Sequence, residues 1–119
     1  MNILIADDEE VLRMLIVDTL EEEGHVLTEA VDGKDAIEQF QEGKFDLLLV
    51  DYMMPRMTGI EVIRQVRETS KVKIVMLTAK TQEKDVEEAK EAGADFVFPK
   101  PFSPFKLIEL IEELDGEQK

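Results

Sequence analysis

The stretch Leu47-Leu48-Leu49-Val50-Asp51 is an unbroken apolar run that stops at a carboxylate. Its length suits a β-strand, and the lack of polar alternation is typical of a strand buried on both faces of a parallel sheet. The more mixed residues 25–31 predict a further strand, at an edge of the sheet. Short, continuous apolar runs like that of Leu47 to Val50 also occur at residues 3–6, 74–77 and 96–98.

Helical patterns separate these strands. A last helix begins with Ser103 as N-cap and Pro104 in its first turn. Gly24, Gly43 and Gly93 each follow a helical pattern, at the place where a glycine in the left-handed conformation commonly ends a helix. The four earlier helices are predicted at residues 9–23, 33–42, 59–69 and 81–92.

The chain is therefore predicted to alternate strand and helix five times, which indicates the α/β class. Five such units are too few for an eight-stranded barrel, so we expect an open, doubly wound parallel sheet with helices on both faces. The most apolar strands should be central, which favours the flavodoxin-like strand order 2-1-3-4-5. We expect one domain over residues 1–119, with any effector function in a partner.

The chain is strongly acidic. Its 14 Lys and Arg residues against 28 Asp and Glu residues give a net charge of −14, which argues against direct binding of nucleic acid or an anionic membrane. The sequence has no cysteine, so disulfides and cysteine nucleophiles are excluded. No apolar run approaches the ~20 residues that span a bilayer, and no signal-peptide pattern opens the chain. We therefore expect a cytoplasmic protein, monomeric or weakly dimeric.

Polar side chains follow the predicted strands where each strand ends. Asp7 and Asp8 follow the first strand, Asp51 the third, Thr78 the fourth and Lys100 the fifth. Because the carboxyl ends of parallel strands share one edge of the sheet, these side chains should converge. The three carboxylates would repel one another without a cation, and a hard divalent ion such as Mg²⁺ prefers oxygen ligands.

A carboxylate is the best candidate nucleophile of this site. The sequence has no glycine-rich phosphate loop, and its only histidine, His25, is predicted at the opposite end of the sheet. With Mg²⁺ and a lysine nearby, a carboxylate can accept a phosphoryl group as an acyl phosphate. Asp51 is favoured as the nucleophile because it is the single carboxylate at the end of a central strand, whereas the adjacent Asp7 and Asp8 are better placed to bind the metal together.

Together these segments resemble the receiver domain of response regulators in two-component signalling, of the kind found in chemotaxis regulators. The resemblance extends over essentially the whole chain, and the motifs occur in order at the predicted strand ends. The matching segments are Ile5-Ala6-Asp7-Asp8-Glu9, Asp51-Tyr52-Met53-Met54-Pro55-Arg56-Met57-Thr58-Gly59, Leu77-Thr78-Ala79, and Gly93-Ala94-Asp95 leading to Lys100-Pro101-Phe102.

The resemblance implies a role for each site residue. Asp51 would accept the phosphoryl group from a sensor histidine kinase or phosphotransfer protein. Lys100 would contact the phosphoryl oxygens, and Thr78 would turn inward to bond one of them. The chain would catalyse only its own phosphorylation and dephosphorylation, and would switch its binding surface for a downstream effector. Mg²⁺, with Mn²⁺ as a substitute, would be held by Asp8 directly, Asp7 through water, Asp51 and the backbone carbonyl of Met53.

Three positions modify this expectation. Met53, two residues after the acceptor, and Lys80, two residues after Thr78, lie where side chains in the family modulate hydrolysis of the phosphoryl group. Val97 stands where the family usually carries Tyr or Phe, so we expect activation to be relayed through Thr78 and the loop after the fourth strand. For Met53, Met54 and Met57 together, packing in the loop and the next helix is favoured over a binding surface.

The first helix indicates a docking surface. Its apolar residues spread round most of its circumference, so those not needed against the sheet could receive a partner helix. Leu12 and Leu15, with Pro101 and Phe102 at the same edge, are the predicted contacts. The alternative is that the helix is buried all round.

Other functions remain open from the residues alone. The chain could be a relay intermediate that passes its phosphoryl group to a second histidine. It could also be a small Mg²⁺-dependent phosphohydrolase with Asp51 as nucleophile, although Met53 is no general acid and no insertion offers a substrate cap. Asp7 and Asp8 could simply cap the first helix.

Overall fold

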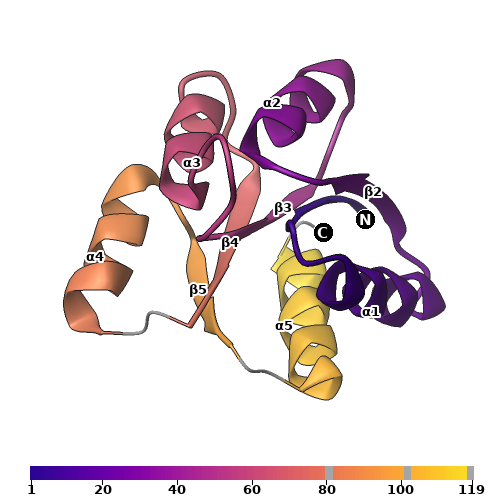
Figure 1. The fold of residues 1–119 in the computed structure, drawn as a ribbon. Coiled ribbons are helices and arrows are strands. Elements are labelled where there is room, and N and C mark those ends of the chain that lie inside the picture. Colours follow the sequence, from indigo (N-terminus) through magenta and orange to yellow (C-terminus); the bar gives the residue numbers. More distant parts are fainter. Residues whose placement is uncertain (80–81, 101–102, 118–119) are drawn as a thin grey trace.

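The computed structural model describes residues 1–79, 82–100 and 103–117. Within these residues, strands and helices alternate along the chain as the sequence predicts (Figure 1). The elements are β1 (Asn2–Ala6), α1 (Glu10–Glu22), β2 (Val26–Ala30), α2 (Gly33–Glu42), β3 (Leu47–Asp51), α3 (Gly59–Arg67), β4 (Lys73–Thr78), α4 (Glu83–Ala92), β5 (Phe96–Pro99) and α5 (Pro104–Glu117).

In the described part of the chain, the five strands form one parallel sheet in the order β2-β1-β3-β4-β5. This order confirms the predicted α/β class and the doubly wound, flavodoxin-like topology. The central strand β3 is buried along its whole length, whereas β2 and β5 are partly exposed at the edges. Continuous apolar runs therefore mark the interior strands, and the mixed stretch marks an edge.

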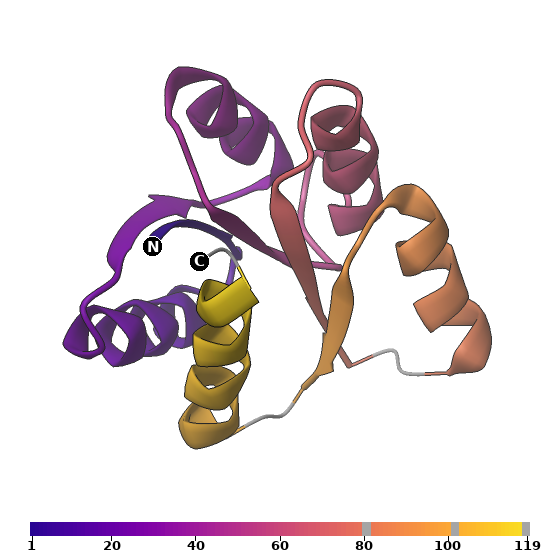
Figure 2. The same cartoon turned by 180° about the vertical axis from the view of Figure 1, so that it is seen from behind.

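Helices cover both faces of the sheet (Figures 1 and 2). Because successive strand residues point to opposite faces, each strand contributes to two cores. Leu48 and Val50 pack in the core beside α2, α3 and α4. Leu47 and Leu49 pack in the core beside α1 and α5. Burial on both sides fixes β3 and so holds its last residue, Asp51, at the carboxyl edge of the sheet.

Three helices end just before Gly24, Gly43 and Gly93, as predicted, and the left-handed conformation is confirmed at two of these glycines. Gly24 and Gly93 have φ values of 90° and 126°, in the region that glycine favours. The prediction is wrong for Gly43, which is extended with φ −117°. There the reason for glycine is space, because a Cβ would lie 2.7 Å from the ring of Phe45. Sequence position alone does not distinguish these two requirements.

Helix α1 has more apolar residues than its buried side needs. Ile16 and Leu20 are buried in the core beneath α1 and α5, and Leu12 is half-buried. Val11 is 82% exposed and Leu15 is 47% exposed, so the alternative of a helix buried all round is wrong. None of the helices in the described residues is long and apolar enough to cross a bilayer.

Candidate functional site

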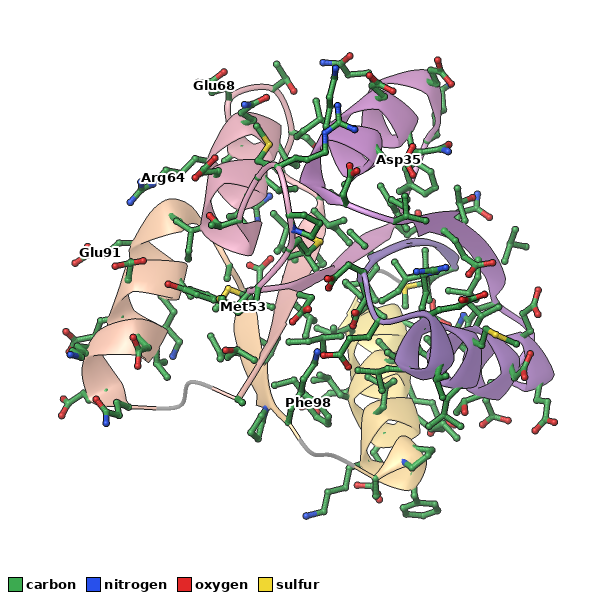
Figure 3. All side chains as sticks on the ribbon, in the orientation of Figure 1. Asp35, Met53, Arg64, Glu68, Glu91 and Phe98 are labelled. Carbon is green, nitrogen blue, oxygen red and sulfur yellow. The ribbon has the colours of Figure 1, made fainter. Side chains whose placement is uncertain are left out.

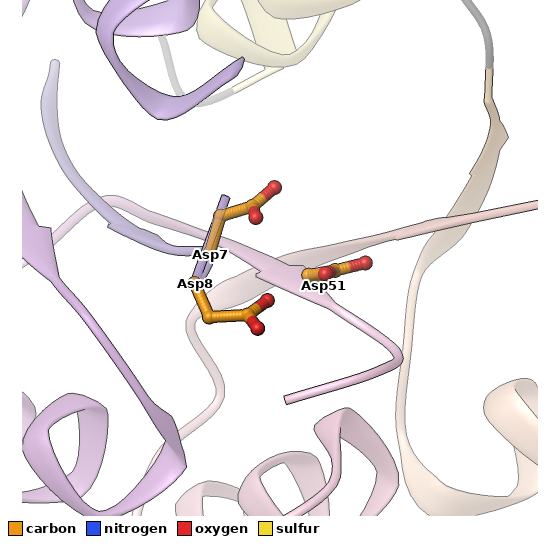
Figure 4. A group of neighbouring side chains, drawn as sticks. All are labelled: Asp7, Asp8 and Asp51. Carbon is orange, nitrogen blue, oxygen red and sulfur yellow. The ribbon is translucent and has the colours of Figure 1, made fainter. Parts of the chain in front are cut away.

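The predicted site residues meet at the carboxyl edge of the sheet. Asp7 and Asp8 lie in the loop between β1 and α1, and Asp51 ends the neighbouring strand β3 (Figure 4). One carboxylate oxygen from each of the three lies within 4.8 Å of the others. Thr78 ends β4, and Lys100 directly follows β5. The topology therefore brings together side chains that are far apart in the sequence.

The three carboxylates differ in burial. Asp7 is fully buried and Asp51 is only 4% exposed, whereas Asp8 is exposed. The Oδ1 atom of Asp7 accepts a hydrogen bond of 2.8 Å from the backbone amide of Glu9. Because Glu9 itself is the N-cap of α1, neither aspartate caps the helix, and the capping alternative is wrong. The acidic pair instead faces Asp51.

Lys100 is the cation of the site. Its Nζ donates to Oδ1 of Asp51 at 3.0 Å and to Oδ2 of Asp7 at 3.4 Å, and it lies 3.9 Å from a carboxylate oxygen of Glu9. The backbone amide of Lys100 donates to the carbonyl of Thr78 at 2.8 Å, which joins the ends of β4 and β5. One ammonium thus faces several carboxylates, and the site retains an excess of negative charge.

This excess, with burial, shifts the protonation of the site. Burial raises the pKa of Asp51 to about 6, with help from the negative charges of Asp7 and Asp8 and against the hydrogen bond from Lys100. Burial also raises the pKa of Asp7, against its bonds to Glu9 and Lys100. The pKa of Lys100 is raised although burial opposes this, because Asp51 and its neighbours favour the charged ammonium. A further cation would relieve this repulsion.

The donor set fits a hard divalent cation. Three carboxylates with ligand atoms within 4.8 Å of one another offer the oxygen ligands that Mg²⁺ prefers. The exposure of Asp8 leaves the site open to solvent on one side, and Mg²⁺ commonly keeps several waters when a few carboxylates bind it. Asp7, Asp8 and Asp51 can therefore hold Mg²⁺ together.

The turn after β3 packs closely against the peptide group of Asp51. At Gly59, a Cβ would collide with the carbonyl oxygen of Asp51, so only glycine lets the start of α3 pack against that peptide. Gly59 also donates its amide to the carbonyl of Tyr52 at 2.9 Å. Arg56 has φ 71°, in the left-handed region, and lies 3.7 Å from a carboxylate oxygen of Asp32. These features hold the loop close to Asp51.

The methionines of this loop differ in their environment. Met54 is buried and Met57 packs against the core beside α2, α3 and α4, which agrees with the packing interpretation. For Met53 that interpretation is wrong, because its side chain is 62% exposed (Figure 3). The residue lies beyond the end of β3, where the chain has left the sheet.

Residues of the predicted switch lie on both faces of the sheet. Thr78 is buried beside the site. Val97 packs against the core on the α2, α3 and α4 side, whereas Phe98 packs against the core on the α1 and α5 side. A relay through Thr78 remains a prediction. Three predicted residues, Lys80, Pro101 and Phe102, lie outside the described part of the chain.

His25 is far from the carboxylates in the fold, as the sequence predicts. It immediately precedes β2, at the amino end of the sheet, and accepts a hydrogen bond of 3.0 Å from the N-terminal ammonium of Met1 at its Nδ1. Burial and that ammonium lower the pKa of His25. His25 therefore lies outside the carboxylate site.

One close neighbour of the site was not among the predicted residues. Arg13 of α1 donates from Nη1 to the backbone carbonyl of Asp7 at 2.7 Å, and from Nε to Oε1 of Glu29 at 2.9 Å. The signal for it in the sequence is an arginine amid the apolar residues of the first helix, five residues after Asp8. Periodicity alone does not show which way such a side chain turns.

Comparisons with known proteins find relatives of the chain in sequence. The family model described as "Response regulator receiver domain" matches residues 3–112. The transcriptional regulatory protein ResD of Bacillus subtilis is 43% identical over 113 residues, which are 95% of this chain and 47% of that protein. The chain thus spans about half the length of the curated relatives it matches.

Solved receiver structures share the whole fold. The receiver domain of the Francisella response regulator 1452 has a TM-score of 0.94 and 29% identity, covering 99% of this chain and 98% of that one. The response regulator protein TrrA from Thermotoga maritima, in complex with Mg²⁺-BeF, has a TM-score of 0.84 and 34% identity, covering 95% of this chain and 97% of that one.

Proposed function

The chain belongs to the family of response regulator receiver domains, and we propose that it is a phosphorylation switch that accepts a phosphoryl group on Asp51. The observation that carries the proposal is the Asp51 carboxylate itself. It is buried, hydrogen-bonded to Lys100 at 3.0 Å, and close to two further carboxylates that could hold a metal. The proposed donor is a phosphohistidine on a sensor kinase or phosphotransfer protein.

The proposed reaction is a direct transfer. An oxygen of the ionised Asp51 forms a bond to phosphorus while the bond from phosphorus to the histidine nitrogen breaks, and the electron pair of that bond goes to the imidazole. Lys100 then exchanges its bond to Asp51 for the oxygens of the transferred group. Thr78 donates its hydroxyl to one of them. Catalysis by the chain's own residues is thus positioning and charge neutralisation.

The metal of this proposal is Mg²⁺, with Mn²⁺ as a substitute. Its ligands would be Asp7, Asp8, Asp51 and the backbone carbonyl of Met53. When bound, Mg²⁺ would supply positive charge beside the phosphoryl oxygens, in addition to the charge of Lys100. The negative excess of the site and its raised pKa values support this assignment.

The experiment that tests the proposal is phosphorylation by a small donor. We expect the protein to gain the mass of one phosphoryl group, by intact mass spectrometry, after incubation with acetyl phosphate and Mg²⁺. Asp51→Ala and removal of Mg²⁺ by chelation should each abolish the gain, whereas Asp18→Ala, which removes an exposed carboxylate of α1, should not. Phosphorylation that persists in Asp51→Ala would contradict the proposal. Rapid multiple turnover of varied phosphate esters would favour the phosphohydrolase instead.

The proposed docking surface for the phosphodonor lies on α1. The helix begins just after Asp8, so a partner helix placed on its exposed apolar residues would be close to Asp51. Val11, Met14 and Leu15 are exposed there, and Leu12 is half-buried. Pro101 and Phe102 would extend this surface. A return of the phosphoryl group to a second histidine would use the same surface.

The output of the switch is proposed to lie outside residues 1–119. Curated relatives carry the name transcriptional regulatory protein, and this chain matches about half of each. Control of transcription is therefore the output that we propose, exerted by a further part of the same polypeptide or by a partner. With a net charge of −14, residues 1–119 are themselves poorly suited to bind DNA. The cytoplasmic location and the monomeric or weakly dimeric state remain predictions.

The side chain of Met53 is proposed to control the lifetime of the phosphoryl group, as is that of Lys80. Because Met53 is 62% exposed and lies two residues after Asp51, it can shield the acyl phosphate from water. We expect Met53→Ala to change the decay rate of phosphorylated protein several-fold, measured by intact mass after the donor is removed. Leu15→Ala, which removes another exposed apolar side chain, should leave the decay unchanged. An unchanged rate in Met53→Ala would contradict this role.

A further inference from the structure

Arg13 connects helix α1, strand β2 and the loop that carries Asp7 and Asp8. It belongs to the first turn of α1, yet its side chain is only 11% exposed. Its Nη1 reaches the carbonyl of Asp7 at 2.7 Å, and its Nε reaches Glu29 of β2 at 2.9 Å. Because burying a guanidinium is costly unless it is paired, these two contacts determine where the side chain lies.

The contact to Asp7 is made to the peptide group that carries Asp8. The carbonyl of Asp7 and the amide nitrogen of Asp8 belong to one planar peptide group. The hydrogen bond from Arg13 to this carbonyl therefore fixes the orientation of the peptide group from which the Asp8 side chain extends. On its other side, Asp7 donates its own amide to the carbonyl of Ala30 in β2 at 3.2 Å. The backbone at Asp7 is therefore held at both of its peptide groups.

Asp8 depends on this backbone anchor more than the other two carboxylates do. Asp7 and Asp51 are buried and bonded to Lys100 through their side chains. Asp8 is exposed, and no residue within the described ranges donates a hydrogen bond to its carboxylate. Its direction toward the other two carboxylates thus comes from the chain on which it sits.

We propose that Arg13, held by Glu29, is a positioning residue that aims the Asp8 carboxylate at the metal site. The inference rests on the proposed Mg²⁺ site and extends it to a residue that touches neither the metal nor the phosphoryl group. Outer contacts of this kind orient ligands in metal sites, and their loss typically weakens metal binding by about 10- to 100-fold.

Electrostatics and positioning predict opposite signs for the loss of Arg13. The guanidinium is a positive charge next to the site, so it repels a divalent cation. If Arg13 acted only through its charge, its removal would strengthen Mg²⁺ binding. If it positions Asp8, its removal weakens binding despite the more negative site. The direction of the change therefore distinguishes the two roles, and a purely structural role would leave the affinity of the folded protein unchanged.

The test is the Mg²⁺ affinity of Arg13→Met, measured by isothermal titration calorimetry near pH 8. We expect the dissociation constant to rise about tenfold relative to the unsubstituted protein. Arg64→Met is the matched control, because it removes the same charge from an exposed position in the last turn of α3 (Figure 3). The dissociation constant of Arg13→Lys should lie between those of Arg13→Met and the unsubstituted protein, since the lysine ammonium can donate to the Asp7 carbonyl without also binding Glu29.

Each outcome decides one question. An unchanged or tighter Mg²⁺ affinity in folded Arg13→Met would overturn the positioning role while leaving the proposed function intact. If the unsubstituted protein binds no Mg²⁺, the proposed function itself fails. If circular dichroism shows that Arg13→Met does not fold, Arg13→Lys and Glu29→Gln decide: both should bind Mg²⁺ more weakly, and affinity equal to that of the unsubstituted protein in both would overturn the inference.

Discussion

Asn in place of Asp51 will stabilise the metal-free protein near pH 8 by about 1–3 kcal/mol. Burial raises the pKa of Asp51 from 3.8 to about 6, which corresponds to about 3 kcal/mol against the ionised carboxylate in the fold. The amide removes this charge and the repulsion from Asp7 and Asp8. The figure of about 3 kcal/mol is already net of the favourable hydrogen bond and charge of Lys100, which oppose the rise in pKa.

The pH dependence gives the sign of the effect. A carboxyl group whose pKa is higher in the fold than in the unfolded chain contributes stability that is fully present below pH 3.8. That contribution is lost as the pH rises through about 6. The advantage of Asp51→Asn should therefore be small near pH 4 and large near pH 8. Urea unfolding in the presence of a chelator, at several pH values, measures it.

A control and a reversal make this test specific. Asp18→Asn removes an exposed carboxylate and should change the free energy of unfolding by less than about 0.5 kcal/mol at every pH. Added Mg²⁺ should stabilise the unsubstituted protein more than Asp51→Asn, because the variant lacks one ligand. Metal-free Asp51→Asn that is less stable than the unsubstituted protein near pH 8 would contradict the argument.

The sequence predicts the sheet well because burial leaves a simple signal in it. A strand covered by helices on both faces has no solvent-exposed face that would carry polar residues, so Leu47 to Val50 form a continuous apolar run. Once the parallel order is known, the site follows from topology, since Asp7, Asp51 and Lys100 all come at strand ends. The ammonium of Lys100 lies within hydrogen-bond distance of the carboxylates of both Asp7 and Asp51, which agrees with that expectation.

Other features depend on contacts that periodicity does not encode. Gly43 ends a helix without the left-handed conformation, because the ring of Phe45 occupies the space that a side chain would need. Met53 is exposed because the chain has left the sheet, although its residue type suggests packing. Arg13 lies among apolar residues of α1 but bonds to Asp7, and only the three-dimensional structure supplies its partner.

The stability prediction and the proposed function have one cause. Burial and nearby negative charges make the ionised carboxylates of Asp7 and Asp51 unfavourable in the metal-free fold, as their raised pKa values indicate. Sites that bind a cation commonly retain such unfavourable charge, because binding relieves it. A chain selected for stability alone would not gather these charges here.

Met in place of Lys100 will slow phosphorylation of Asp51 by acetyl phosphate by about 100-fold at saturating Mg²⁺, the scale of losing one preorganised donor to a developing charge. Lys100 donates to Asp51 at 3.0 Å from a side chain only 14% exposed, so its charge is little screened by water. In the metal-free protein its hydrogen bond also lowers the pKa of Asp51, so without it more of that carboxyl group is protonated at neutral pH.

These two contributions of Lys100 can be separated by pH, because they respond to it differently. Loss of rate caused by protonation of Asp51 should disappear as the pH is raised to about 9, where the carboxylate is ionised in either protein. Loss of rate caused by the missing positive charge should persist at that pH. If Lys100→Met is still phosphorylated more slowly near pH 9, as followed by intact mass over time, Lys100 stabilises the charge of the transferring phosphoryl group. Lys106→Met removes an equal but exposed charge from α5 and should react at the normal rate. Full recovery of Lys100→Met near pH 9 would reduce the role of Lys100 to keeping Asp51 ionised.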